Sequence, residues 1–286
     1  MPTTISSIRN RAIERLSTAG IESADVDAEL LIGHVLGLSR GQVQAKAVTE
    51  SAVLDEDSAR ILELVARRES REPLQHITGK APFRSLELAV GLGVFVPRPE
   101  TEQVAQFAID MLRAVASANP IAVDLGTGSG AIALALATEV GHATVYAVEN
   151  SPEAFSWTER NFKESRVTNA HLVFADLADA FPELDGVVDV VISNPPYIPS
   201  AAVPRDPEVR LFDPERALYG GEDGLDVVHK VSKTGLRLLH PGGTLVIEHG
   251  ELQAAEVAAL LRADGWSAVS SHRDLLGRDR ATTALR

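Results

Sequence analysis

The sequence predicts an α/β protein in which a mostly parallel, seven-stranded sheet follows a small N-terminal helical bundle. From residue 121 onward, short apolar runs alternate with amphipathic or alanine-rich segments, a pattern typical of strands joined by crossover helices. Before residue 80, apolar residues recur every three to four positions without the alternation of a strand. We therefore expect a helical domain at 1–79, a β-hairpin linker at 80–98 and an α/β domain at 99–286.

Three segments of the first domain carry helical periodicity. The first begins near Ile5 and ends at Gly20, the second runs from about Asp25 to Gly37, and the third covers 57–69. Glycine just beyond a helix takes the left-handed conformation that ends it. A bundle of this size is either a structural cap or a module that docks a partner, and the sequence leaves both open.

The linker carries the signal of a β-hairpin. Residues 83–90 partly alternate, glycines at 91 and 93 supply a turn, and residues 94–96 provide a returning strand. A helix is expected to begin at Glu100. Beyond it, the expected strands are 121–125, 144–149, 171–174, 187–193, 244–248, 267–270 and 282–285, and the helices among them are 130–138, 152–163, 225–239 and 252–261.

Composition narrows the class of protein. No apolar run approaches the roughly 20 residues of a membrane span, and the N-terminus lacks the pattern of a secretory signal, so we expect a cytoplasmic protein without membrane association. The absence of cysteine excludes disulfides and thiolate ligands. The eight histidines show no metal-ligand spacing, so no metal site is expected.

The charge is unevenly distributed. The net charge of −13 divides into −2 for residues 1–90 and −11 for residues 91–286. A protein that binds a polyanion normally neutralises phosphates with Lys and Arg. The acidic second part therefore disfavours a direct nucleic-acid partner and favours a protein partner.

A glycine-rich loop joins the first expected strand of the sheet to a helix. Its sequence, Asp-Leu-Gly-Thr-Gly-Ser-Gly at 124–130, lets the backbone pass close to a ligand at the helix N-terminus. The spacing also fits the dinucleotide-binding pattern of a dehydrogenase, and a loop without a ligand is a third possibility. The candidate cofactor residues are Asp124, Gly126, Thr127, Gly128, Ser129, Gly130, Glu149, Asp176, Leu177 and Asn194.

The acidic residues favour S-adenosylmethionine over a dinucleotide. Asp124 lies where its carboxylate would attract an ammonium group and repel a pyrophosphate. Asp176 follows the third strand, where it can reach an adenine amino group, and Glu149 can accept hydrogen bonds from ribose hydroxyls. The segment after the fourth strand offers nothing for hydride transfer.

That segment is the tetrapeptide Asn-Pro-Pro-Tyr at 194–197, at the expected carboxyl end of a strand. An amide or exocyclic amino nitrogen is a poor nucleophile, because its lone pair is delocalised into a π-system. The side-chain oxygen of an asparagine and a proline carbonyl can accept its two N–H groups, and a tyrosine ring can stack on the planar group. We predict catalytic roles for Asn194, Pro195 and Tyr197 and substrate binding by Asn194, Pro195, Pro196 and Tyr197. Nucleobase amino groups and the glutamine amide both fit this arrangement, and a plain rigid turn is the structural alternative.

With these motifs in this order, the chain resembles the release factor glutamine methyltransferases (the PrmC/HemK family) over roughly residues 67–280. The most specific segments are Pro-Arg-Pro-Glu-Thr-Glu at 97–102 and the region 212–225. The resemblance implies a Rossmann-like class I methyltransferase domain that uses S-adenosylmethionine. It implies methylation of the amide nitrogen (N5) of the glutamine in the Gly-Gly-Gln motif of peptide-chain release factors. By the same resemblance, residues 126–130 line the cofactor, Glu149 holds its ribose and residues 194–197 hold the glutamine.

Two positions depart from the family pattern. Glu149 stands where aspartate is frequent, and Leu177 stands where an aromatic residue is common against the adenine. N6-adenine DNA methylation is the alternative activity, and a binding protein that retains the loop without catalysis is the alternative class.

Two further groups of residues are less decided. We expect Arg98 and Glu100 to form structural ion pairs at the domain junction rather than to act in catalysis. Phe212, Asp213 and Glu215 lie on a long segment after the tetrapeptide. That segment is either a lid over the glutamine or a plain loop.

Overall fold

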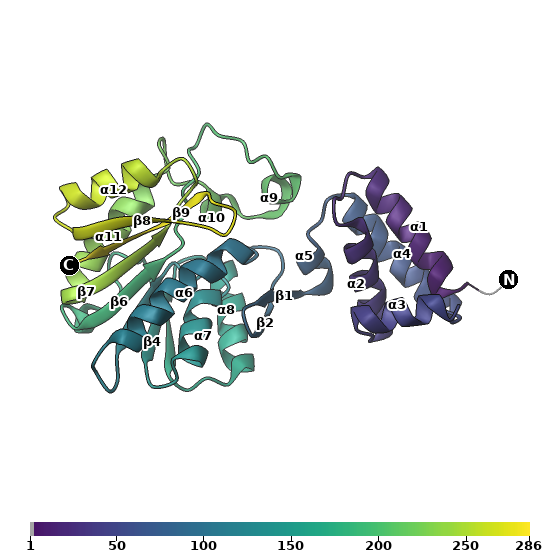
Figure 1. The fold of residues 1–286 in the computed structure, drawn as a ribbon, viewed down its shortest axis with the longest axis horizontal. Coiled ribbons are helices and arrows are strands. Elements are labelled where there is room, and N and C mark those ends of the chain that lie inside the picture. The colour runs from purple at the N-terminus through teal and green to yellow at the C-terminus, as the bar shows by residue number, and fades with distance from the viewer. Residues whose placement is uncertain (1–2) are drawn as a thin grey trace. The chain divides into compact units, whose positions relative to one another are not determined.

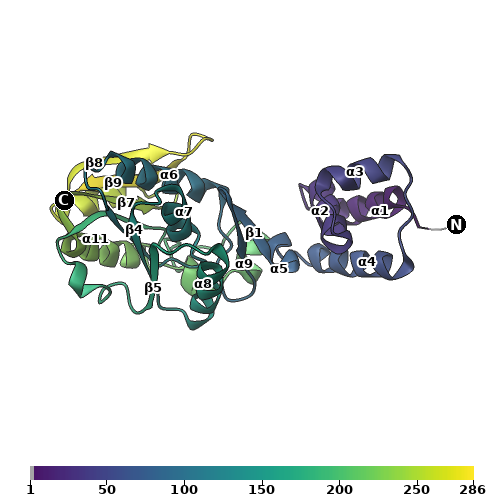
Figure 2. The same ribbon diagram turned by 90° about the horizontal axis from the view of Figure 1, so that it is seen from below.

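The computed structural model describes residues 3–286 and divides into two compact units. The helical unit consists of the chain up to Gly79 together with the distant segment Pro204–Phe212. The α/β unit consists of Lys80–Val203 and Asp213–Arg286 (Figures 1 and 2). Sequence patterns did not predict that a segment after residue 200 packs with the N-terminal helices.

The helical unit contains three helices that periodicity did not predict, α3, α5 and α9. The expected helices are present, and the additional α3 has one buried apolar residue, Val43, so it shows no apolar periodicity. A capping box between Ser39 and Gln42 starts it instead. Among the described residues, the helices of this unit are α1 (Ile5–Thr18), α2 (Ala24–Leu36), α3 (Arg40–Val48), α4 (Asp55–Glu69), α5 (Leu74–Thr78) and α9 (Pro207–Phe212).

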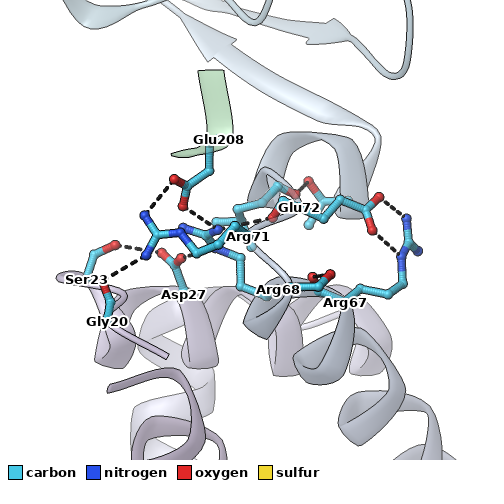
Figure 3. Close-up of polar contacts among 11 residues, drawn as sticks. Gly20, Ser23, Asp27, Arg67, Arg68, Arg71, Glu72 and Glu208 are labelled. Carbon is cyan, nitrogen blue, oxygen red and sulfur yellow. Dashed lines mark hydrogen bonds and ion pairs between the residues drawn. The ribbon is translucent and has the colours of Figure 1, made fainter. Parts of the chain in front are cut away.

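A buried cluster of ion pairs holds α9 within the helical unit (Figure 3). The Glu208 carboxylate accepts hydrogen bonds from Arg68 at 2.7 Å and from Arg71 at 2.6 Å. Arg68 also donates to Asp27 on α2 at 2.7 Å. Because Glu208, Arg68 and Asp27 are all buried, this network replaces the hydration that their charges lose.

The α/β unit is built on the expected seven-stranded, mostly parallel sheet, in the order β5-β4-β3-β6-β7-β9-β8. Strands β3 to β7 run parallel to one another, and β9 pairs antiparallel with both β7 and β8. The chain order reverses between β3 and β6, and such switch points are where open α/β sheets bind ligands. The strands are β3 (Ile121–Leu125), β4 (Thr144–Glu149), β5 (Ala170–Phe174), β6 (Val188–Ser193), β7 (Leu239–Glu248), β8 (Ser267–Arg273) and β9 (Asp279–Leu285).

Helices cover both faces of this sheet, as its apolar central strands require. Residues of α6 and α7 share one core with Ala122, Val190 and Val246. Residues of α11 and α12 share the other core with Val123 and Val191. In Figure 1, α6, α7 and α8 lie together on one side of the sheet. The helices of this unit are α6 (Pro99–Ala114), α7 (Ala131–Glu139), α8 (Pro152–Ser165), α10 (Glu215–Leu218), α11 (Asp226–Leu238) and α12 (Ala254–Ala263), with a 3₁₀ turn at Pro182–Leu184.

The hairpin of the linker is shorter than expected. Strands β1 (Lys80–Phe83) and β2 (Leu86–Ala89) pair antiparallel, so the turn lies at residues 84–85. Arg84 supplies the positive φ of 53° that this turn uses. The prediction of a returning strand at Val94–Val96 was wrong, since these residues belong to no strand.

The two glycines assigned to that turn serve packing instead. A Cβ atom on Gly91 would lie 2.5 Å from the Trp157 ring, and one on Gly93 would lie 2.7 Å from the Glu153 side chain. Both neighbours belong to α8. Glycine is therefore needed at these positions because helix α8 approaches the backbone closely.

Candidate active site

The glycine loop at 124–130 follows β3 at the switch point of the sheet. Gly126, Gly128 and Gly130 have φ values of +76°, +59° and +84°, which residues with side chains rarely adopt. A Cβ atom on Gly126 or Gly128 would meet nothing within 4 Å, whereas one on Gly130 would lie 3.0 Å from Thr158. The first two glycines therefore border open space, which suits a ligand held against the backbone.

Asp124 stabilises this loop through two hydrogen bonds. It is fully buried, and its Oδ2 accepts hydrogen bonds from the Thr127 hydroxyl at 2.6 Å and from the Ala133 N–H at 3.1 Å. Its Oδ1 has no hydrogen-bond partner among residues 3–286. Burial raises the pKa of Asp124 to about 7, with a contribution from Glu149 and against the two hydrogen bonds. A cationic group that reaches this carboxylate would stabilise its charged form.

Glu149 links the loop to the turn that follows β4. Its Oε2 accepts the Gly128 N–H at 2.9 Å, and its Oε1 accepts the N–H groups of Asn150 at 2.9 Å and Ser151 at 2.8 Å. A carboxylate offers about four acceptor positions, so one remains for a ligand. Glu149 thus holds the loop in shape and can still bind a hydroxyl.

Asp176 and Leu177 lie after β5 at the same edge of the sheet. Asp176 Oδ1 accepts the Ala178 N–H at 3.0 Å, and its Oδ2 lies 3.5 Å from the Asn150 amide nitrogen. Leu177 packs on the core beneath α11 and α12. The candidate cofactor residues from β3, β4 and β5 therefore gather along one edge, because the three strands are parallel and adjacent.

Asn194 follows β6, the neighbour of β3 on the other side. Its side-chain nitrogen donates to the Thr101 hydroxyl at 3.3 Å. Within residues 3–286, neither Asn194 Oδ1 nor the carbonyl oxygen of Pro195 accepts a hydrogen bond. Both oxygens that the sequence proposed as acceptors for a substrate N–H are therefore available.

The tetrapeptide is held in place by two glycines and a glutamine that sequence reasoning did not assign to the site. A Cβ atom on Gly220 would lie 2.4 Å from the Pro196 carbonyl oxygen, and one on Gly224 would lie 2.3 Å from the Tyr197 carbonyl oxygen. The Gln253 side chain donates to that same Tyr197 oxygen at 2.9 Å. The two glycines belong to the segment that carries the family resemblance. Their spacing in that segment was the sequence signal that could have assigned them to the site.

The Tyr197 phenol remains neutral at any ordinary pH. Burial raises its pKa to about 12, with a further contribution from the Glu248 carboxylate, while Arg280 and Arg98 act in the opposite direction. Tyr197 can therefore offer a ring face and a hydroxyl group to a substrate without carrying charge.

Arg98 and Glu100 form ion pairs, as expected, and all their partners belong to the α/β unit. Arg98 contacts Asp213 at 2.5 Å and lies over the Phe95 ring, 4.9 Å from its centroid. Glu100 contacts Arg278 at 2.9 Å. These contacts tie the start of α6 to the segment after α9 and to the β8–β9 hairpin.

The segment expected to form a lid is divided between the two units. Phe212 ends α9 in the helical unit, whereas Asp213 is buried in the α/β unit and Glu215 begins α10. Closure of these residues over a substrate stays a prediction.

Residues 3–286 contain no group of three or more His, Asp or Glu side chains placed to hold a metal ion. Over the same range, no helix is long and apolar enough to cross a membrane.

Comparison with known proteins places both units in one family. The PrmC N-terminal domain family matches residues 7–79, and the methyltransferase small domain family matches residues 89–213. The release factor glutamine methyltransferase of Streptomyces coelicolor is 50% identical over 96% of this chain and 95% of its own length. That of Bifidobacterium longum is 44% identical over 98% of this chain and 99% of its own length.

A third relative has a different name. The 4-amino-L-phenylalanine/4-methylamino-L-phenylalanine methyltransferase of Streptomyces pristinaespiralis is 39% identical over 99% of this chain and 95% of its own length. The higher identity and nearly complete coverage of the two preceding relatives decide the assignment: the chain belongs to the release factor glutamine methyltransferase family.

Proposed function

We propose that this protein transfers a methyl group from S-adenosylmethionine to the side-chain amide nitrogen (N5) of the glutamine in the Gly-Gly-Gln motif of peptide-chain release factors. The observation that carries the proposal is the pair of free acceptors, Asn194 Oδ1 and the Pro195 carbonyl oxygen, beside the glycine loop. A primary amide has two N–H groups, so two acceptors can hold it and leave its faces accessible.

The residues around the glycine loop fit the cofactor. The unpartnered Asp124 oxygen suits the ammonium group of the methionine portion, and the open backbone at 126–130 suits its chain. Glu149 has an acceptor position for a ribose hydroxyl, and Asp176 one for the adenine amino group. Leu177 gives the adenine an aliphatic contact. When bound, S-adenosylmethionine supplies an electrophilic methyl group on a sulfonium.

The chain's own contribution is orientation and electrostatics. Asn194 and Pro195 accept the two amide N–H groups, and the Tyr197 ring stacks on the amide plane. As the nitrogen takes the methyl group it gains positive charge, so these two hydrogen bonds strengthen in the transition state. Orientation of this kind can contribute up to about 7–11 kcal/mol. The alkylated nitrogen is acidic and loses its proton to water, so no strong base is required.

The partner and the compartment follow from this substrate. The net charge of −13 suits a protein substrate better than DNA, so N6-adenine methylation is not favoured. We place the reaction in the cytoplasm, where peptide-chain release factors act. The helical unit is proposed to dock the release factor.

One relative motivates a second candidate substrate. The Streptomyces pristinaespiralis relative is named for 4-amino-L-phenylalanine, whose aniline nitrogen is also conjugated with a π-system. The same two acceptors could hold an aniline NH₂ group. The relatives with higher identity favour the release factor.

A competition experiment tests the proposal. The protein is incubated with labelled S-adenosylmethionine, a release factor, duplex DNA and 4-amino-L-phenylalanine together, and the labelled product is identified by mass spectrometry. We expect label on the glutamine of the Gly-Gly-Gln motif alone. Label on DNA or on the amino acid instead would contradict the proposal.

The Asn194→Ala variant tests the mechanism in the same assay. Loss of an acceptor used in the transition state should lower kcat about 100-fold to 1,000-fold. The affinity for S-adenosylmethionine, measured by titration calorimetry, should change much less. Turnover like that of the wild type would remove the proposed role of Asn194.

A further inference from the structure

A buried acid, Glu248, lies beneath the tetrapeptide, and the mechanism above does not use it. It is 2% exposed at the end of β7. In the parallel pairing of β6 with β7, Ser193 lies opposite Ile247, so Asn194 and Glu248 are the next residues on adjacent strands. The register of the sheet therefore brings this acid beside the proposed catalytic asparagine.

The Thr101 hydroxyl contacts the Asn194 side chain. Thr101 is 3% exposed in the first turn of α6, and its oxygen accepts the Asn194 NH₂ group at 3.3 Å. An oxygen that accepts this hydrogen bond can direct its own hydrogen toward an acid. Both Thr101 and Asn194 act to lower the pKa of the Glu248 carboxyl group, as donors near a carboxylate do.

Burial and neighbouring groups shift the pKa of Glu248 in opposite directions. Burial raises its pKa to about 7, Thr101 and Arg280 lower it, Glu100 raises it, and Asn194 lowers it. Its Oε2 has no hydrogen-bond partner among the described residues 3–286. In its charged form, the Glu248 carboxylate attracts hydrogen-bond donors and not acceptors.

This arrangement bears on which end of the Asn194 side-chain amide, oxygen or nitrogen, faces the substrate. The two ends of its amide have similar shape, so a rotation of 180° exchanges oxygen and nitrogen. With the oxygen toward the substrate, Asn194 accepts an N–H group of the glutamine amide. With the nitrogen there, two NH₂ groups would face each other and the proposed hydrogen bond could not form.

We propose that Glu248 is a positioning residue for methyl transfer: with Thr101, it holds the Asn194 NH₂ group inward, so that Oδ1 faces the substrate amide. The inference rests on the proposed function, because it assigns Asn194 Oδ1 the role of acceptor. It adds two residues, Glu248 and Thr101, that touch neither substrate nor cofactor.

Thr101 offers the cleanest test, because two substitutions of similar size separate its hydroxyl from its bulk. Thr101→Val removes the hydroxyl, and Thr101→Ser keeps it. We expect the kcat of Thr101→Val to fall about 10-fold, the effect of one neutral hydrogen bond. Thr101→Ser should lose no more than about threefold, and both should bind S-adenosylmethionine with nearly the affinity of the wild type.

Glu248 is tested by a second matched pair. Glu248→Gln keeps an acceptor oxygen and should retain most of the kcat, whereas Glu248→Leu removes both acceptors and should lower kcat about 100-fold. Nuclear magnetic resonance of the Asn194 side-chain NH₂ group gives a readout independent of turnover. Its protons should exchange with solvent faster in Thr101→Val and Glu248→Leu than in the wild type and the two conservative variants.

The outcomes separate this inference from the proposed function. If the wild type does not label the release factor, the proposed function fails. If the wild type is active but Thr101→Val and Thr101→Ser have the same kcat, the positioning role is contradicted. A loss of cofactor affinity equal to the loss of kcat would also contradict it, since that result indicates a general disturbance of the fold.

Discussion

Replacement of Glu208 by glutamine should lower the free energy of unfolding of the helical unit by about 3 kcal/mol. Glu208 is 9% exposed, and its carboxylate contacts Arg68 at 2.7 Å and Arg71 at 2.6 Å (Figure 3). Removal of one partner from a buried ion pair costs about 3–5 kcal/mol. Arg68 keeps Asp27 at 2.7 Å, and Arg71 keeps the carbonyl of Gly20 at 2.8 Å, so we expect a loss near the lower limit.

The lowered pKa of Glu208 indicates a stabilisation of the same sign. Burial alone would raise this pKa, but hydrogen bonding with Asp206, Arg68 and Arg71 outweighs burial and lowers the pKa from 4.5 to about 2. At about 1.36 kcal/mol per pKa unit, a lowering of this size stabilises the folded state by roughly 3 kcal/mol.

The sign of the shift sets the pH dependence. A carboxylate with a lowered pKa stabilises the folded state above its unfolded pKa, and this stability is lost as pH falls toward the folded value. Between pH 7 and pH 4, the wild type should lose just under about 1 kcal/mol of the Glu208 contribution. The difference between wild type and Glu208→Gln should therefore narrow by that amount.

Hydrogen exchange with mass spectrometry measures this difference, because peptides from α4 report on the helical unit separately from the α/β unit. Glu22→Gln is the matched control, since Glu22 is exposed and forms no ion pair among residues 3–286. A difference below about 1 kcal/mol in the opening free energy of α4 would refute the reasoning, because it lies far under the lower limit for a broken buried pair. So would a difference that stays constant from pH 7 to pH 4.

Three further predictions concern the α/β unit. Gly224→Ala should lower kcat at least about 10-fold with little change in cofactor affinity, because the new Cβ would lie 2.3 Å from the Tyr197 carbonyl oxygen; steady-state kinetics that match the wild type would contradict this. The pKa of Asp124 is raised to about 7, so the affinity of the wild type for the cofactor should fall as the pH drops below 7. Calorimetry should find no such pH dependence in Asp124→Asn, and a dependence retained in that variant would assign it to another group. Leu275 and Leu276 are 94% and 76% exposed. Changing both to serine should raise KM for a whole release factor but not for a short Gly-Gly-Gln peptide, and equal effects on the two substrates would exclude a docking role for these two leucines.

The α/β fold was predictable because its signals are local. Strands β3 and β6 are buried on both faces, so they appear in the sequence as apolar runs with a single aspartate in each. Helix α1 buries Ile5, Ile8, Ala12 and Leu16 along one side, which gives the spacing of a helix. In both cases, the pattern depends on burial along one short stretch of chain.

The secondary-structure predictions were wrong where a contact with a distant part of the chain, and not local sequence, determines the structure. Gly91 and Gly93 resemble turn glycines in sequence, but the approach of α8 is what requires them. Arg84 carries no signal for the turn that it forms at the tip of the hairpin. Helix α3 has too few buried residues for periodicity to reveal it.

The sequence by itself determined the chemistry of the candidate site: a glycine loop with Asp124 for the cofactor, and Asn194 with Pro195 for a conjugated nitrogen. Only the tertiary structure decided how these groups are held. Thr101 contacts Asn194 across 93 positions of the chain, and Arg68 contacts Glu208 across 140. Such pairs leave no periodic trace, because strand register and helix packing, and not local spacing, bring their side chains together.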